Sequence, residues 1–297
     1  MNGRERGFLL LSSNLGDSMR KPLSTAQMRV LADRSWQMDI PEPERDIMPQ
    51  DLMAIGYGEA MAQRIVSLLS QEDVLDAYLA RGKRAECVPL TRVSGGYPLH
   101  LRKRLALDSP GVLWVKGNAE LLRTPMVSLV GSRDLHPENE AFAKMVGRQA
   151  ALQGYTLVSG NARGADKTAQ EACLEAGGNV ISVVADDLSQ HRLRERVLYI
   201  SEEDFDAEFS AQRALSRNRV IHALGEKTFV AQCHAGMGGT WDGTVKNLRF
   251  GWSDVFCFHD GSEGINRLQQ MGAQLVTLTD LKDFSSLTTQ YPNFFDQ

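Results

Sequence analysis

Short apolar runs alternate with longer mixed stretches from about residue 126 to residue 281. Runs of four or five apolar residues bounded by turn residues are typical of buried strands, and the mixed stretches carry apolar residues at helical spacing. The predicted strands cover residues 126–130, 156–159, 180–184, 198–201, 227–231, 254–258 and 274–278, and the predicted helices cover 138–153, 167–176, 211–224, 241–250 and 265–271. This alternation predicts an α/β fold built on a doubly wound, mostly parallel sheet.

In the first 88 residues, the apolar residues recur at the spacing of an α-helix. Within them Gly56-Tyr57-Gly58 separates two short apolar stretches, a pattern typical of a helix-hairpin-helix. The glycines either serve a tight turn alone or let its amides face a DNA phosphate, and both interpretations stay open. We therefore predict a small N-terminal helical domain over 1–88 (helix-hairpin-helix or SAM-like), a connector over 89–125 with a short strand at 112–117, an α/β domain over 126–282, and a loosely held tail over 283–297.

The composition is that of an ordinary globular protein, with 42% hydrophobic and 24% charged residues and a formal net charge of −4. No apolar run approaches the length needed to cross a bilayer, so no membrane association is predicted. The four cysteines are scattered, which favours reduced thiols and a cytoplasmic location. One segment, 81–104, carries seven basic residues and one acid, and indicates either solvated helix faces or a nucleic-acid footprint.

Glycine-rich turns carrying arginines follow two successive strands. The first reads Gly131-Ser132-Arg133, and the second contains Ser159-Gly160 and Arg163-Gly164. Such turns lead into helix N-termini, where unpaired amides and the positive end of the helix dipole attract phosphate. Arginine adds a fork of donors that matches phosphate oxygens. The two turns together predict an anion site.

Two further elements are expected at the same edge of the sheet. Arg217, Asn218 and Arg219 stand inside a predicted helix, and a glycine turn with Gly236, Gly238, Gly239 and Thr240 joins a strand to the next helix. Thr240 either caps that helix or faces phosphate with its hydroxyl. The glycine spacing is not that of a dinucleotide-binding fingerprint, and no Walker lysine motif is present. We predict no catalytic residue, no cofactor and no metal ligand.

These four elements, in this order, resemble the DNA-processing protein A family (DprA, also called Smf). The likeness extends from Tyr97-Pro98 to Gly272-Ala273 and so covers about residues 97–278. It implies a Rossmann-like, non-enzymatic competence and recombination protein that binds and protects incoming single-stranded DNA during DNA uptake. A homodimer and assistance in loading the RecA recombinase are implied as well.

The resemblance also assigns the site residues. It implies that Gly131, Ser132, Arg133, Ser159, Gly160, Arg163 and Gly164 line a phosphate pocket. Its other wall would be Arg217, Asn218, Arg219, Gly236, Gly238, Gly239 and Thr240.

The chain also departs from the family pattern. Gln170 stands where the family has histidine, and Ala185-Asp186-Asp187 replaces a glycine-rich turn, bringing two acids near the predicted anion site. Segment 202–208 is acidic, and no C-terminal winged-helix domain is expected before Gln297. Two alternatives therefore stay open: a non-catalytic sensor of a small phosphorylated nucleotide, and a nucleoside-monophosphate phosphoribohydrolase, whose glutamate position would fall at Gly243.

Overall fold

A computed structural model describes residues 1–36, 46–202 and 204–289 of the chain. Residues 290–297 of the predicted tail lie outside the described part. Among the described residues, no helix is both long and apolar enough to cross a membrane.

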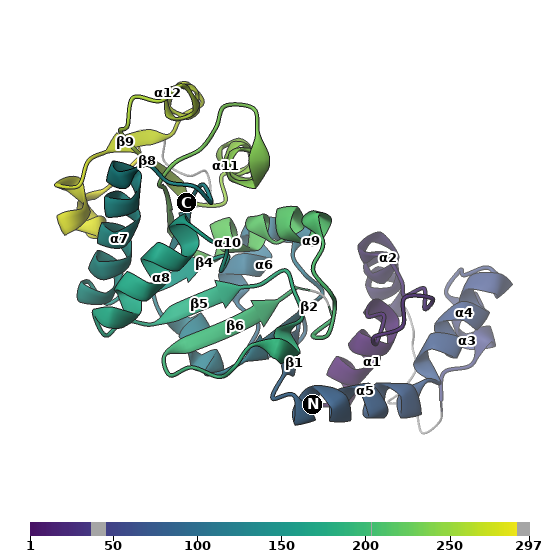
Figure 1. The fold of residues 1–297 in the computed structure, drawn as a ribbon. Coiled ribbons are helices and arrows are strands. Elements are labelled where there is room, and N and C mark those ends of the chain that lie inside the picture. Colours follow the sequence, from purple (N-terminus) through teal and green to yellow (C-terminus); the bar gives the residue numbers. More distant parts are fainter. Residues whose placement is uncertain (37–45, 203, 290–297) are drawn as a thin grey trace.

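The described residues build one nine-stranded sheet in the order β1-β2-β6-β5-β4-β3-β7-β8-β9 (Figure 1). Its strands are β1 (Val88–Thr91), β2 (Val112–Lys116), β3 (Met126–Val130), β4 (Thr156–Ser159), β5 (Val180–Val183), β6 (Val197–Ser201), β7 (Lys227–Val230), β8 (Asp254–Phe258) and β9 (Gln274–Val276). Strands β3 to β9 pair in parallel, while β2 pairs antiparallel with both β1 and β6. This confirms the doubly wound, mostly parallel α/β sheet.

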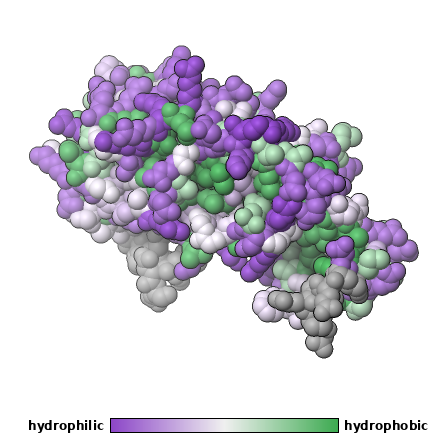
Figure 2. Space-filling model, turned by 90° about the horizontal axis from the view of Figure 1, so that it is seen from below, coloured by the Kyte–Doolittle hydropathy of each residue, from purple (hydrophilic) through white to green (hydrophobic). Residues whose placement is uncertain are grey.

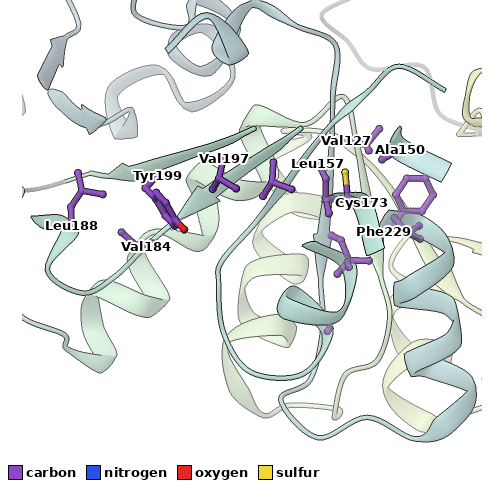
Figure 3. Close-up of a cluster of buried hydrophobic side chains, with 14 of the residues drawn as sticks. Val127, Ala150, Leu157, Cys173, Val184, Leu188, Val197, Tyr199 and Phe229 are labelled. Carbon is purple, nitrogen blue, oxygen red and sulfur yellow. The ribbon is translucent and has the colours of Figure 1, made fainter. Parts of the chain in front are cut away.

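Helices cover both faces of this sheet. The helices of this part of the chain are α6 (Leu99–Leu105), α7 (Pro137–Leu152), α8 (Ala165–Glu175), α9 (Ala211–Ser216), α10 (Asn218–Leu224), α11 (Gly238–Phe250) and α12 (Glu263–Gln270). One buried cluster holds α7 and α8 against the sheet, and a second holds α6, α10, α11 and α12 against the opposite face. Figure 3 shows part of the first cluster, with Ala150 and Cys173 from the helices beside Val127 and Leu157 from the strands.

The apolar runs form strands because both faces of the sheet are covered. All residues of β3, β4, β5 and β6 are buried, as expected for parallel strands between two helical layers. The single helix predicted over 211–224 is instead two helices, α9 and α10, which meet at Arg217.

The N-terminal region is helical, with α1 (Gly3–Ser12), α2 (Thr25–Ser35), α3 (Pro49–Ala54), α4 (Glu59–Leu69) and α5 (Glu72–Arg84). Helices α3 and α4 form the predicted hairpin, and Gly56 adopts a φ of +90° in its turn. The Arg34 guanidinium lies over the Tyr57 ring and donates to the Gly56 carbonyl. Leu52, Ile65 and their neighbours form a small core of their own. Figure 2 shows apolar side chains both over the main part of the molecule and on this smaller helical part.

An aromatic cluster joins the helical region to the sheet. Phe205 lies with its ring centroid 5.0 Å from Tyr78 of α5 and 4.8 Å from Trp114 of β2. Tyr78 also donates to Asp206, with which Arg81 forms an ion pair. Desolvation in this cluster raises the pKa of Tyr78 well above its ordinary range, so the phenol stays protonated as a donor.

We expect Phe205→Ala to lower the free energy of unfolding by about 3 kcal/mol or more, because it empties a buried aromatic site. Chemical denaturation followed by tryptophan fluorescence measures the loss. Phe209→Ala, at a site 59% exposed, is the matched control and should cost far less. Equal losses for the two variants would contradict the role of Phe205.

Strands β1 and β2 place part of the predicted connector in the main sheet, with Trp114 only 1% exposed. The expectation of a loosely held tail is wrong for its first residues. Phe284 is fully buried, its amide donates to Gln153, and Thr289 donates to Asp254. The Phe284 ring packs on Tyr155 and Phe229, with ring centroids 5.8 and 4.7 Å apart. The division of the chain into domains at 88, 125 and 282 stays a prediction.

Candidate functional site

The sheet has a switch point between β3 and β7. After β3 the chain adds β4, β5 and β6 on one side, and it then crosses to add β7, β8 and β9 on the other. Loops that leave the carboxyl ends of two such strands diverge and leave a crevice, the usual ligand position in doubly wound sheets. The turns after β3 and β7 both belong to this edge.

The first two arginine-bearing turns pack directly on each other. The Ala165 amide donates to the Ser132 carbonyl at 3.1 Å. Gly164 has a φ of +81°, and a Cβ on it would lie 2.4 Å from the Arg133 carbonyl oxygen and 2.5 Å from that of Ser132. Only glycine therefore fits between the two turns, which places Arg133 beside Arg163.

The other two elements join the same edge through side chains. Thr240 donates from its hydroxyl to the Gly131 carbonyl at 2.9 Å. The Asn218 amide donates to the Gly239 carbonyl at 2.9 Å, and Arg217 donates to the Gly160 carbonyl at 2.9 Å. All four elements expected at one edge of the sheet therefore meet there.

Gln232, which sequence reasoning missed, holds the loop after β3 in place. Its backbone carbonyl accepts from the Ser132 amide, and its side chain accepts from His136 and donates to the Asp134 carbonyl. The sequence did carry a signal for this role, because Gln232 is a polar residue directly after the apolar run of β7. A buried side-chain amide at the end of a strand needs hydrogen-bond partners.

A pocket of about 280 Å³ opens at this edge. It is lined by Arg133, Gly160, Asn161, Ala162, Arg163, Ala185, Asp186, Phe209, Ala214 and Arg217. Arg133 is exposed, and Arg163, 75% exposed, forms an ion pair at 2.6 Å with Asp134, which is 85% exposed. An exposed pair of this kind is weak, so a phosphate can replace the carboxylate.

Arg217 forms the buried floor of the pocket. The whole residue is 8% exposed, and its guanidinium lies so close to Gly160 that a Cβ there would stand 1.7 Å from Nη1. Burial lowers the pKa of Arg217, and the neighbouring Asp166 opposes that effect. Asp166 also accepts from the Ala162 amide and so closes the turn that precedes α8. The pocket therefore has one buried cation and two exposed ones.

Several of the residues expected to bind phosphate have other partners. Ser159 is fully buried and accepts from Gln170 at 2.6 Å, which takes it out of the pocket. Arg219 turns away, donates to the Asp108 carbonyl and pairs with Glu202 at 2.8 Å. The Thr240 hydroxyl donates to the Gly131 carbonyl. Gly236 lies in the turn before α11 and Gly238 begins that helix, and both are exposed. Gly131, Ser132, Gly164, Asn218 and Gly239 shape the edge without lining the pocket.

Six residues that line the pocket are not among the predicted site residues, and the side chains of two of them bear on ligand chemistry. Asp186 follows β5, and Phe209 stands 59% exposed in the loop before α9. For Phe209 the signal was an aromatic residue in a polar, acidic segment, because such a residue is exposed unless a partner covers it. Asp186 had been noted only as an acid near an anion site.

Three arginines of the basic run over 81–104 bind groups elsewhere in the fold. Arg81 pairs with Asp206, Arg92 donates to the Ala106 carbonyl, and Arg104 donates to the carbonyls of Ala223 and Gly225. These arginines hold segments of the fold together, which favours the structural interpretation for them. In the described part of the chain no group of three or more His, Cys, Asp or Glu side chains is arranged to hold a metal ion.

Fold and site together define a doubly wound α/β protein with an arginine-lined pocket at the carboxyl ends of β3, β4 and β5. Residues 89–287 match the family model of DNA recombination-mediator protein A. The chain belongs to this family, which confirms the resemblance seen in the sequence.

Individual relatives agree with this assignment. The chain is 32% identical over 191 residues to DNA processing protein DprA of Streptococcus pneumoniae, covering 57% of this chain and 64% of that protein. It is 30% identical over 186 residues to Protein Smf of Escherichia coli, covering 57% of this chain and 49% of that protein. The matches thus span less than two thirds of the length of these relatives.

Solved structures show the same fold. The X-ray structure of DprA from Streptococcus pneumoniae aligns with a TM-score of 0.73 at 24% identity, over 97% of this chain and 99% of that one. DprA from Helicobacter pylori, whose structure was described for its single-stranded DNA binding mode, aligns with a TM-score of 0.56 at 23% identity, over 66% of this chain and 94% of that one.

Proposed function

We propose that this protein binds single-stranded DNA through the pocket at the edge of β3, β4 and β5. The observation that carries the proposal is the meeting of Arg133, Arg163 and Arg217 around one opening. Guanidinium groups bind phosphate oxygens with two parallel hydrogen bonds, and two exposed arginines above a buried one fit a backbone that passes over the pocket. The single-stranded DNA binding described for the Helicobacter pylori relative supports the same ligand.

The proposal includes the biological role implied by the family. A recombination mediator delivers single-stranded DNA to a recombinase, so RecA is the proposed partner and the protection of incoming DNA the proposed task. A homodimer and a cytoplasmic location belong to the same proposal. We propose a binding protein rather than an enzyme.

The geometry at Gly243 gives no support to nucleotide hydrolysis. A Cβ on this residue would lie 3.0 Å from His222 Nε2 and 3.2 Å from Asn218 Cβ, so α10 packs closely on this position and a side chain there would press on it. The neighbouring carboxylate, that of Asp242, lies on the exposed side of α11. General acid–base chemistry needs a carboxyl group within hydrogen-bond reach of the substrate, which this turn does not place there.

A salt titration tests the DNA proposal. We expect affinity for a single-stranded oligonucleotide to fall steeply with salt, by a logarithmic slope of about 0.7 for each phosphate neutralised. Duplex DNA and free nucleoside monophosphates are the comparison ligands, measured under the same salt conditions. Tight binding of a mononucleotide without binding of the oligonucleotide would favour the nucleotide sensor, and a flat salt response would reject phosphate recognition.

A further inference from the structure

The pocket has an acidic and an apolar lining residue in addition to its arginines. Asp186 and Phe209 line it together with the guanidinium groups of Arg133 and Arg217. A carboxylate weakens phosphate binding by like-charge repulsion, so its presence in the same small opening needs another explanation. The inference below rests on the proposed function.

A hydrogen bond to His191 orients the Asp186 carboxylate. Its Oδ1 is 2.9 Å from His191 Nε2, and the His191 ring stacks on Tyr199 of β6 with the centroids 4.8 Å apart. His191 is itself only 15% exposed, whereas the Asp186 side chain is 51% exposed. The carboxylate is therefore oriented by a packed imidazole and still open to a ligand.

The charge state of Asp186 suits an acceptor. The hydrogen bond to His191 is the main cause that lowers the pKa of this carboxyl, so it is ionised at neutral pH. An ionised carboxylate accepts hydrogen bonds and donates none. The ligand group that meets Asp186 must accordingly be a donor, which no phosphodiester provides.

Nucleobases provide such donors on their Watson–Crick edges. Cytosine and adenine each present an exocyclic amino group, and guanine presents two neighbouring N–H donors. Thymine presents a single N–H between two carbonyl oxygens, which a carboxylate repels. Phe209, 59% exposed at the same opening, supplies an apolar face for the base.

We propose that Asp186 reads the edge of one base of the bound strand, while Arg133 and Arg163 hold its phosphates. The site then prefers strands that offer guanine, cytosine or adenine at this position and disfavours thymine. Asp186 acts as a specificity residue, and His191 acts as a positioning residue behind it.

The experiment compares short oligo-dC, oligo-dT and oligo-dT with isolated guanines, in low salt, for the wild-type protein and for Asp186→Asn. We expect the wild type to bind oligo-dC and the guanine-containing strand about tenfold more tightly than oligo-dT, from the discrimination typical of a base-edge contact. In Asp186→Asn the ratio should fall to near one, because the amide can donate to the thymine carbonyls.

Asp187→Asn is the matched control. This variant removes one negative charge at the neighbouring residue. The Asp187 carboxylate accepts hydrogen bonds from the amide and hydroxyl of Ser189, and Asp187 is not among the residues that line the pocket. The tenfold preference over oligo-dT should persist in Asp187→Asn, and a thermal unfolding curve checks that this variant is folded.

The outcomes are distinct. A ratio near one in the wild type, or one that Asp186→Asn leaves unchanged, overturns the role of Asp186. An equal gain of affinity for every strand in Asp186→Asn also overturns it, since it shows a charge effect alone. Failure of the wild type to bind any strand instead rejects the DNA-binding function itself.

Discussion

Replacing Arg133 and Arg163 together by alanine is expected to weaken single-stranded DNA binding about a hundredfold. Each charged hydrogen-bonding group contributes about 1.5 kcal/mol or more, which is about a factor of ten in affinity. Both side chains are exposed, so their removal should leave the fold intact. The salt slope should fall by about 1.4, because two phosphate contacts are lost. Fluorescence anisotropy at several salt concentrations measures both quantities.

Arg123→Ala is the matched control for this double variant. Arg123 is 65% exposed and pairs with Glu120 at 2.9 Å, much as Arg163 pairs with Asp134. It lies in the turn before β3 begins and therefore at the opposite edge of the sheet. An equal loss in the control would show a nonspecific charge effect, and unchanged binding in the double variant would reject the assigned role of the two arginines.

Gly164→Ala is expected to destabilise the protein by about 3 kcal/mol or more and to abolish tight DNA binding. A Cβ at this position meets two backbone carbonyl oxygens at 2.5 Å or less, and neither can move without separating the turns that carry Arg133 and Arg163. The backbone strain at φ +81° adds roughly 1–2 kcal/mol. Urea denaturation gives the loss of stability, and the same anisotropy assay gives the loss of binding.

Gly154→Ala is the control that separates the cost of backbone strain from the cost of the steric contacts at Gly164. Gly154 has a φ of +78°, yet a Cβ there has no atom within 4 Å. This control should therefore cost only the strain of the left-handed backbone, about 1 kcal/mol, and should bind DNA normally. Similar costs for the two variants would show that the close approach at Gly164 is unimportant.

The sequence predicted the sheet well because its signals were local. The central parallel strands β3 to β6 are buried on both faces, so each forms a nearly continuous apolar run that ends at a turn residue. The order of strands and helices then allowed few topologies. Antiparallel pairing of β2 with β6 was not predicted, since a strand inside a presumed connector carries no sign of its distant partner.

The site was predicted in outline and not in detail. Gly160 and Gly164 were found because a turn after a strand needs glycine, and both glycines are indispensable for packing. Ser159 and Arg219 belong to the same motifs, but Gln170 and Glu202 engage them elsewhere. A side chain that lies one residue from a pocket can point into the core, and motif spacing alone does not give that direction.

The sequence by itself determined the α/β architecture, the edge of the sheet at which the four turns meet, and the family to which the chain belongs. These properties follow from apolar periodicity and from glycine positions, which are local constraints on the backbone. Only the tertiary structure decided which side chains share the pocket, and it brought Asp186 and Phe209 to Arg133 and Arg163 from segments more than 20 residues away. Contacts between distant segments depend on packing across the whole sheet, which no local pattern encodes.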